Sequence, residues 1–269
     1  DPNDPATLAP RALLFQRPLA LGLVACNNTL MRYLDLTLPT PEANLALDEA
    51  LLEAAETAGQ PNEVLRVWEP DSTAVIVGRS SQLADEVELA ACRDAGVPVL
   101  RRTSGGAAVV IGPGCLMYAL VLSYEKRPVL RAVDQAHRVV LGRIASTLRP
   151  LIGEICCRGT SDLALGLHKC SGNSVRCKRT HLLYHGTLLY DFPASTIEAL
   201  LEMPPRQPEY RDGRSHGRFV VNLPLEPEAL RRALREAWGV ERPLDSWPEQ
   251  ETSRLITERY GRADWNRSR

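Results

Sequence analysis

The chain has 269 residues, 44% of them hydrophobic and 24% charged, with a formal net charge of −1. This length and composition allow one large α/β domain with a full core, whereas the balanced charge excludes a general basic field for nucleic acid or anionic membranes. No apolar run is long enough to span a bilayer. Seven cysteines without a C-x-x-C pair favour free thiols in a cytoplasmic protein over a metal site or a disulfide framework.

Residues 1–30 are rich in proline and asparagine and have no recognisable periodicity. We expect them to form a tail, either disordered or a mispredicted extension, with Met31 as the true start. The alternative is export, because residues 19–26 resemble the apolar core of a lipoprotein signal peptide. That core is short, however, and follows directly on Arg17-Pro18.

Helix and strand signals alternate from residue 31 onward. The first half predicts a strand (31–36), a helix capped at Thr40, two strands paired through a Pro-Asp turn (64–68 and 73–77), a short helix (85–95) and a strand (97–100). The second half predicts strands at 116–123, 162–165, 173–176 and 182–190, and helices at 130–148, 195–201, 227–238 and 249–260. The predicted fold is α/β of the α+β type, a mixed sheet flanked by helices, in a single domain over residues 31–269 with a helical C-terminal segment.

Two short segments carry most of the chemistry. The first, Arg101-Arg102-Thr103-Ser104-Gly105-Gly106-Ala107, places two cations and a Gly-Gly turn directly before a β-branched strand. Glycine permits positive φ and lets backbone N–H groups approach a ligand, and arginine binds carboxylate or phosphate with a planar fork. The second, Lys169-Cys170-Ser171-Gly172-Asn173, offers a lysine at another tight turn. Together they predict a pocket for a small acid that is activated through phosphate.

Common nucleotide and hydrolase motifs are missing from the sequence. There is no P-loop, no G-x-G-x-x-G between a strand and a helix, and no G-x-S-x-G. A P-loop enzyme, a Rossmann dinucleotide site and an α/β-hydrolase are therefore disfavoured.

The order and spacing of several motifs resemble the catalytic domain of the lipoate–protein ligase A family. These motifs are Gly78-Arg79, Glu86, the Arg101–Gly106 run, Asp162, the Lys169–Asn173 run, Arg176 and His185-Gly186-Thr187-Leu188-Leu189. The resemblance extends from about residue 31 to 192, with an echo in residues 260–266. It implies the fold of the biotin/lipoate ligase superfamily, which is similar to the cores of class II tRNA synthetases.

The resemblance also implies a reaction. Such enzymes use ATP with Mg²⁺ to convert lipoate, or octanoate, into an acyl-adenylate. They then pass the acyl group to a lysine of a lipoyl domain of a 2-oxoacid dehydrogenase complex or of the glycine cleavage H protein. Lys169 matches the essential lysine, which can hold the carboxylate and the α-phosphate. The implied substrate-binding residues are Arg79, Arg102, Ser104, Gly105, Gly106, Ala107, Asp162, Ser171, Gly172, Asn173, His185, Gly186 and Thr187.

Most of these roles have a structural alternative. Lys169 could be a surface lysine at a turn, and the arginines could form solvated salt bridges. Asp162 could be a strand-edge charge that resists aggregation, and His185 a hydrogen-bonded core histidine. We expect no role for His137 on a helix surface or His168 at a turn. The polar loop 204–216 either guides an acidic acceptor domain or is only a solvated surface.

The sequence departs from the family pattern in three places. Ala107 stands where the family has a third glycine, and Ile111 where ligases often have histidine. The stretch after Phe192 is short, so we expect no separate accessory domain and expect a separate protein to supply its function, unless the chemistry differs.

The second interpretation is an ATP-independent octanoyl- or lipoyl-transferase that carries the acyl group on a cysteine. Cys156 and Cys157 lie in roughly the corresponding region, and Arg158 could lower a thiol pKa there. The structural alternative for both is a buried cysteine on a strand. A third interpretation is a non-catalytic paralogue that binds lipoate or an adenylate.

Overall fold

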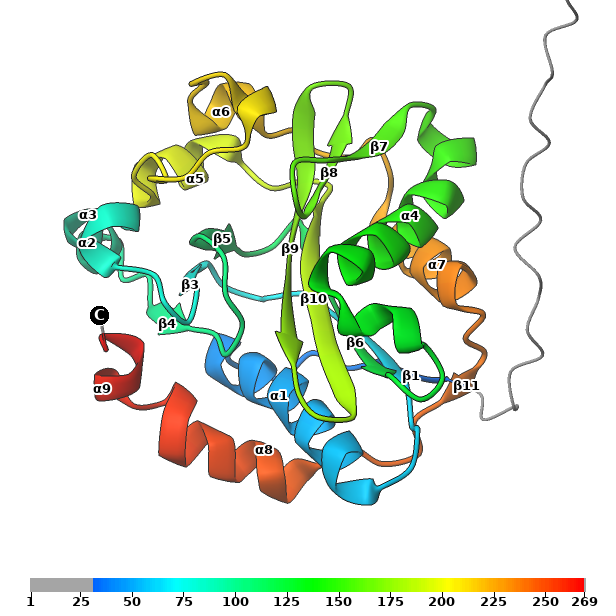
Figure 1. The fold of residues 1–269 in the computed structure, drawn as a ribbon. Helices are drawn as coiled ribbons and strands as arrows, with labels where there is room; N and C mark the ends of the chain where they lie inside the picture. Colours follow the sequence, from blue (N-terminus) through cyan, green and yellow to red (C-terminus); the bar gives the residue numbers. More distant parts are fainter. Residues whose placement is uncertain (1–30, 269) are drawn as a thin grey trace, which may run out of the picture.

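Two β-sheets form the framework of this chain (Figure 1). The computed structural model describes residues 31–268, so the tail expected over residues 1–30 lies outside the described residues. The large sheet has the strand order β11-β1-β2-β6-β10-β9-β8-β7. Its strands are β1 (Arg32–Asp35), β2 (Val64–Trp68), β6 (Cys115–Ser123), β7 (Ile155–Arg158), β8 (Asp162–Leu165), β9 (His168–Cys177), β10 (His181–Leu189) and β11 (Arg242–Pro243). The small sheet has the order β4-β3-β5, with β3 (Ala74–Val77), β4 (Val99–Arg101) and β5 (Val109–Ile111).

Helices cover both faces of the large sheet, which confirms the predicted mixed sheet flanked by helices. The α-helices are α1 (Pro41–Ala58), α2 (Leu83–Glu86), α3 (Leu89–Asp94), α4 (Val133–Ile152), α5 (Ala194–Leu200), α6 (His216–Phe219), α7 (Pro227–Trp238), α8 (Glu249–Leu255) and α9 (Ala263–Asn266). Two 3-10 helices, η1 (Pro128–Arg131) and η2 (Glu209–Arg211), and a π-helix, η3 (Ile256–Tyr260), complete the elements. Of the described helices, none is long and apolar enough to cross a membrane.

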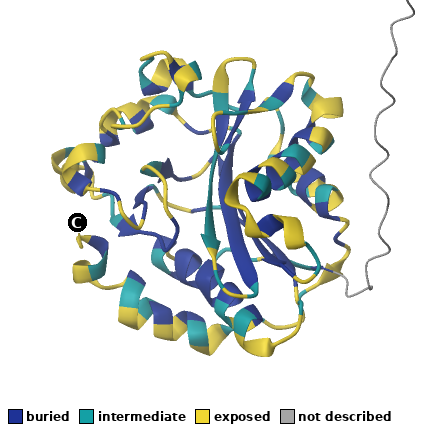
Figure 2. Cartoon of the chain, in the orientation of Figure 1, coloured by how far each residue is buried: buried dark blue, intermediate teal, exposed yellow. Residues whose placement is uncertain are grey.

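The central strands are buried on both faces, as the dark strands of Figure 2 show. Alternate residues of β6 point to opposite sides because side chains alternate along a strand. Leu120 and Leu122 pack with α4 and α7 in one core, whereas Ala119 and Val121 pack with α1 in another. The alternation therefore gives the large sheet one face under α4 and another under α1.

Two predicted elements were wrong in their pairing or continuity. Strands β2 and β3 are not a hairpin: both edges of β2 are occupied, by β1 and β6, so β3 pairs with β4 and β5 in the small sheet. The helix predicted over residues 85–95 is split into α2 and α3. Val87, between the two helices, is extended and forms a bridge with Leu201.

Other predictions need smaller corrections. Lys169 and the Ser171–Asn173 segment lie within strand β9, not at a tight turn. The helix predicted over residues 249–260 begins as α8 and ends as the π-helix η3. His137 does not lie at the helix surface: it is 7% exposed, and its Nδ1 lies 2.9 Å from the Tyr184 hydroxyl. Strand β8 is paired on both sides, so Asp162 is not an edge residue.

Candidate active site

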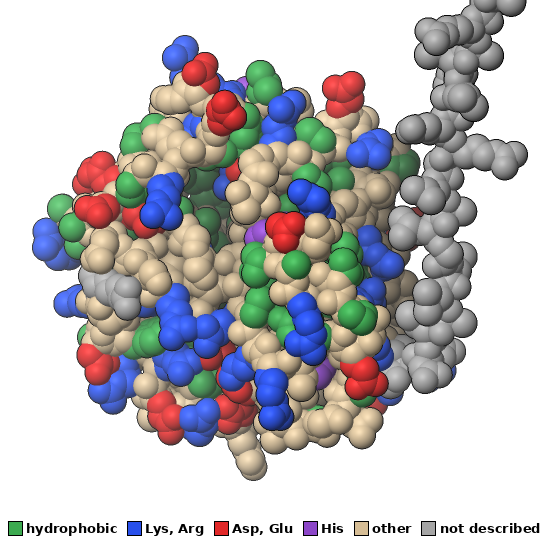
Figure 3. Space-filling model, in the orientation of Figure 1, with side chains coloured by type: hydrophobic (Ala, Val, Ile, Leu, Met, Phe, Trp, Pro, Cys, Tyr) green, Lys and Arg blue, Asp and Glu red, His purple; other side chains and the backbone are tan. Residues whose placement is uncertain are grey.

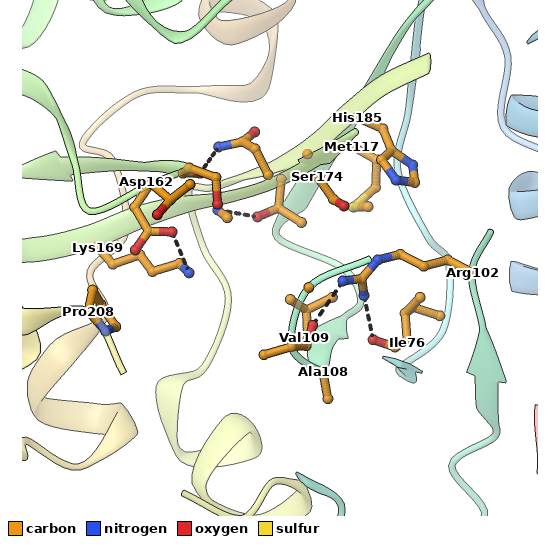
Figure 4. A pocket seen from close by; sticks show the side chains of 18 of the residues that line it. Ile76, Arg102, Ala108, Val109, Met117, Asp162, Lys169, Ser174, His185 and Pro208 are labelled. Atoms are coloured by element: carbon orange, nitrogen blue, oxygen red, sulfur yellow. Dashed lines mark hydrogen bonds and ion pairs between the residues drawn. The ribbon is translucent and has the colours of Figure 1, made fainter. Parts of the chain in front are cut away.

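Lys169 is held over a glycine on the face of the sheet that α1 covers. Residues 162 and 172 are register partners across β8 and β9, and the Gly172 N–H donates to Thr187 Oγ1 on β10 at 3.3 Å. A Cβ atom at position 172 would lie 3.1 Å from Lys169 Nζ, so the absence of a side chain there leaves room for the lysine. Lys169 Nζ lies 2.7 Å from Asp162 Oδ1. The two residues thus form an ion pair (Figure 4).

Tyr210 holds the other oxygen of Asp162. Its hydroxyl donates to Asp162 Oδ2 at 2.8 Å. Tyr210 was not predicted from the sequence, although an isolated aromatic side chain in a proline-rich polar loop was a usable signal. Arg211 beside it is only 3% exposed. Part of the loop 204–216 is therefore packed onto the site and lines the larger cavity, although residues 205–207, 209, 212 and 213 are exposed, so the loop is not only a solvated surface.

The Gly105–Gly106 turn is held by Arg102, and Gly106 lines the same cavity as Lys169 and Arg102, both of which Figure 4 labels. The Arg102 guanidinium donates to the carbonyl oxygens of Ile76 at 3.0 Å, Gly105 at 2.6 Å and Ala107 at 3.0 Å. Gly106 has φ +91°, a conformation that L side chains rarely adopt. Burial lowers the pKa of Arg102 to about 10. Arg102 is therefore not a solvated salt bridge but a buried cation that shapes the loop.

Arg79 does not lie in the cavity. It is exposed, and its N–H donates to the Ser104 carbonyl at 2.8 Å. The backbone of Arg79 thus supports the glycine loop from behind, and its side chain lines neither of the cavities described below.

Two cavities adjoin at Lys169. The larger, of about 340 Å³, is bordered by these predicted residues: Arg102, Gly106, Ala107, Asp162, Lys169, Gly172, Asn173, His185, Gly186 and Thr187. The smaller, of about 140 Å³, shares Ala107, Lys169, Gly172 and Thr187, adds Ser171, and ends among apolar side chains such as Ile197 and Phe219. Ser104 and Gly105 line neither. The space-filling view shows this face hollowed near β5, with hydrophobic side chains inside (Figure 3).

The inner end of the larger cavity carries buried polar groups. His185 Nε2 lies 2.5 Å from Ser104 Oγ, and burial, with a smaller effect of Arg102, lowers the pKa of His185 to about 3. Asp48 of α1 also lines this end, with Oδ2 4.0 Å from His185 Nδ1 and Oδ1 2.5 Å from Arg66. Asp48 was missed; an acid within the apolar stripe of the first helix was the available signal. His185 is therefore neutral. It is hydrogen-bonded and buried, as the alternative interpretation of a core histidine predicted, and it also lines the cavity.

Asn173 and Gly186 border the cavity, but their side-chain positions face the opposite side of the sheet. Residues 118, 186 and 173 are in register across β6, β10 and β9. Asn173 Oδ1 accepts from the Tyr118 hydroxyl at 2.5 Å, and its amide donates to the Ser161 carbonyl at 2.8 Å. Gly186 leaves the space that the Asn173 side chain fills. These motif residues position the strands that carry Lys169.

The two candidate nucleophilic cysteines lie on the edge strand β7. Neither Cys156 nor Cys157 lines either cavity, and burial raises the pKa of the Cys157 thiol. Cys170 follows Lys169 but is fully buried, and burial raises its pKa to about 12. Among the described residues, no group of three or more His, Cys, Asp or Glu side chains could hold a metal ion.

A mixed-sheet fold with a lysine and a glycine loop around a partly apolar cavity defines a class of small-molecule-binding α/β protein. Within that class the chain can be placed more closely, because residues 40–232 match the lipoyl protein ligase A/B catalytic domain. The chain belongs to this family.

Individual relatives include both ligases and transferases. The chain is 36% identical over 163 residues to a protein of Aeropyrum pernix named a lipoate-protein ligase A, covering 60% of this chain and 58% of that one. It is 24% identical over 273 residues to the octanoyltransferase LipM of Moorella thermoacetica, covering 88% and 98%. The chain spans between 52% and 58% of the length of three ligase relatives that it matches.

Solved structures share the fold. One is a bi-partite lipoate protein ligase from Thermoplasma acidophilum, described with its E2 lipoyl domain; its TM-score is 0.74 at 21% identity, covering 89% of this chain and 97% of that one. Another is a lipoate-protein ligase A bound with ATP, with a TM-score of 0.73 at 21% identity, covering 88% and 98%.

Proposed function

We propose that this chain is the catalytic unit of a lipoate–protein ligase. It would join lipoate, or octanoate, to ATP as an acyl-adenylate and then acylate a lysine of a lipoyl domain. The observation that carries this proposal is the position of Lys169, where two cavities meet opposite the Gly105–Gly106 loop. A bisubstrate with an apolar tail, a nucleoside and one central anionic group matches this arrangement.

In the first step, a carboxylate oxygen of the fatty acid attacks the α-phosphorus of ATP and pyrophosphate leaves. Mg²⁺ would enter with the phosphates as part of the co-substrate. The Lys169 ammonium, held by Asp162 at 2.7 Å, would neutralise the negative charge that builds up on the α-phosphate. The backbone N–H groups of the glycine loop would approach the same phosphate from the other side.

In the second step, the amine of the acceptor lysine attacks the acyl carbonyl, an amide bond forms and AMP leaves with its phosphate. The acceptor amine must lose a proton, and Asp162 is the carboxylate nearest to Lys169 that could take it. The proposed acceptors are lipoyl domains of 2-oxoacid dehydrogenase complexes or the glycine cleavage H protein. The structural neighbour from Thermoplasma acidophilum is described as bi-partite, which supports a second polypeptide in the proposed enzyme.

The test is a mass measurement on the acceptor. Purified chain is incubated with apo lipoyl domain, lipoate and MgATP, and in parallel with octanoyl carrier protein without ATP. Acyl mass that depends on ATP supports the ligase. Acyl mass that appears only with octanoyl carrier protein as donor, together with a thioester on Cys156 or Cys157, would show that the chain is a transferase and overturn the ligase proposal. No added mass in either reaction, also with the accessory protein of a bi-partite ligase present, would leave a binding paralogue.

The position of the cysteines favours the ligase over the transferase. A thioester nucleophile must reach the acyl carbonyl and must be present as thiolate. Cys156 and Cys157 lie outside both cavities, and the raised pKa of Cys157 works against ionisation.

A further inference from the structure

We propose that Trp265 and Asn266 of helix α9 are positioning residues for the Gly105–Gly106 loop. Both side chains bind the backbone of Arg101, the residue at which β4 ends and the loop begins. The Arg101 N–H donates to Asn266 Oδ1 at 3.0 Å, and the Trp265 Nε1–H donates to the Arg101 carbonyl at 2.9 Å. Strand β4 is an edge strand, and the Arg101 N–H and carbonyl are hydrogen-bonded by these two side chains where another strand could otherwise pair.

Helix α9 is itself fixed to the core of the protein. The Asn266 amide donates to the Tyr260 carbonyl at 2.9 Å, so a single side chain connects η3 to β4. The Tyr260 hydroxyl donates to Glu49 Oε2 at 2.7 Å, and Glu49, on α1, is 3% exposed. Trp265 and Asn266 therefore bind Arg101 from a helix that is anchored through Tyr260 to α1, the helix that carries Asp48 into the larger cavity.

Arg101 passes this constraint to the loop through its side chain. Its guanidinium donates to the carbonyls of Gly78 at 2.7 Å and Ser81 at 3.0 Å, which holds the turn after β3. That turn contacts the loop directly. Ser81 Oγ donates to the Gly106 carbonyl at 3.2 Å, and a Cβ atom at Gly78 would lie 1.9 Å from the same oxygen.

The resulting path runs from α9 through Arg101 and the turn 78–81 to Gly106. Each step is a hydrogen bond or a backbone contact, so a displacement at Arg101 alters where the Gly106 carbonyl can lie. Gly106 lines the larger cavity, and neither Trp265 nor Asn266 does. They act through the loop and make no contact with a ligand themselves. The weak echo of the family in residues 260–266 thereby acquires a physical role.

The test compares Asn266→Ala and Trp265→Phe with Arg262→Ala. Arg262 lies at the start of α9 and pairs only with Asp264 on the surface, so its replacement is a matched control. The readout is amide hydrogen exchange of Arg79 and Ser81 in the ligand-free protein. The Arg79 N–H bonds the Ser104 carbonyl and the Ser81 N–H bonds the Gly78 carbonyl. In Asn266→Ala we expect the Arg79 and Ser81 amides to exchange about tenfold faster than in wild type. Trp265→Phe should show a smaller acceleration, and Arg262→Ala should exchange at the wild-type rate.

Exchange that changes only within residues 256–268 and at Arg101 would overturn the proposal, because α9 would then be a local structural cover. Asn266→Asp separates the two contacts: it keeps the acceptor for the Arg101 N–H but loses the donor to Tyr260, and should restore part of the protection. If Asn266→Ala does not fold, Trp265→Phe, which keeps an aromatic ring but removes the Nε1–H donor to the Arg101 carbonyl, decides the outcome. The measurement uses no substrate, so its result does not depend on the proposed ligase activity.

Discussion

At the scale of single residues, the charge of Lys169 is already balanced before any ligand enters. Asp162 lies 2.7 Å away and is fixed on its other oxygen by Tyr210. An incoming carboxylate or phosphate must therefore share the ammonium with Asp162, and Tyr210 keeps the aspartate from following the lysine. This arrangement suits a group that must stabilise charge in a transition state without moving.

Replacing Lys169 with alanine should lower the rate of acyl transfer by about 10²–10³-fold, because one preorganised cation at the developing charge is lost. Lys169→Arg should also lose most activity. A Cβ atom at position 172 would lie 3.1 Å from Lys169 Nζ, so the ammonium packs closely over Gly172, and a larger planar guanidinium should not fit in the same place. Rates are measured by the mass of the acceptor. Lys178→Ala is the control, since Lys178 pairs with Glu53 outside both cavities. A wild-type rate in Lys169→Ala would mean that Lys169 does not stabilise the developing charge.

His185 should make the stability of the fold depend on pH. Its pKa is about 3 in the folded protein, against 6.5 for the ordinary imidazole. Between these values the unfolded chain binds more protons, so stability should fall as pH decreases, by at most about 1.4 kcal/mol per pH unit from this group. Urea unfolding from pH 7 to pH 4 should show a shallower slope for His185→Asn than for wild type. Gly142→Ala, which changes no titratable group, should keep the wild-type slope. Equal slopes in all three proteins would mean that His185 does not titrate as its burial requires.

At the scale of elements, the row of residues 118, 186 and 173 ties β6, β10 and β9 together behind the cavity. Gly186→Ala should destabilise the fold by about 3 kcal/mol, because the new Cβ would lie 1.7 Å from Asn173 Oδ1. Gly142→Ala is the matched control. Position 142 in α4 has no atom within 4 Å of a new Cβ, so alanine there should stabilise the helix by about 0.5–1 kcal/mol. Chemical denaturation of the two variants measures the difference, and a neutral Gly186→Ala would show that Asn173 can leave its place.

Hydrophobic periodicity predicted the position of several individual helices and strands well. Strand β8, helix α7 and the long strands β6 and β10 were expected nearly where they occur, because each has a complete apolar face of its own. The pairing of β2 with β3 was wrong because partner choice depends on which strand edges are already occupied, and no local pattern records that.

Part of the candidate site was predicted from the sequence, and part was not. Motifs led to Lys169, Asp162 and the glycine loop, since these residue types at this spacing carry chemistry. They could not show that Asn173 faces away from the cavity, because one residue along a strand reverses the face. They also could not find Asp48 or Tyr210, which come to the site from distant segments and belong to no motif.

At the scale of the whole molecule, the two steps of the proposed reaction place different demands on the chain. The chain spans between 52% and 58% of the length of three ligase relatives, whereas it covers 97% of one chain of a bi-partite ligase. Transfer from an adenylate needs only the cavity, Lys169 and an acceptor. Formation of the adenylate also needs water to be kept from the activated phosphate, which is the work of a closing cover.

We therefore expect the isolated chain to transfer the acyl group readily from preformed lipoyl-adenylate, but to form that adenylate from lipoate and MgATP slowly. Single-turnover transfer and pyrophosphate release measure the two steps separately. Addition of the accessory protein of a bi-partite ligase should accelerate adenylate formation alone, because only that step needs water to be kept from the activated phosphate. Lys169→Ala should slow both steps, which controls for hydrolysis of the adenylate in solution. Rapid pyrophosphate release by the isolated chain would show that the segment 204–216, held at Asp162 by Tyr210, is already a sufficient cover.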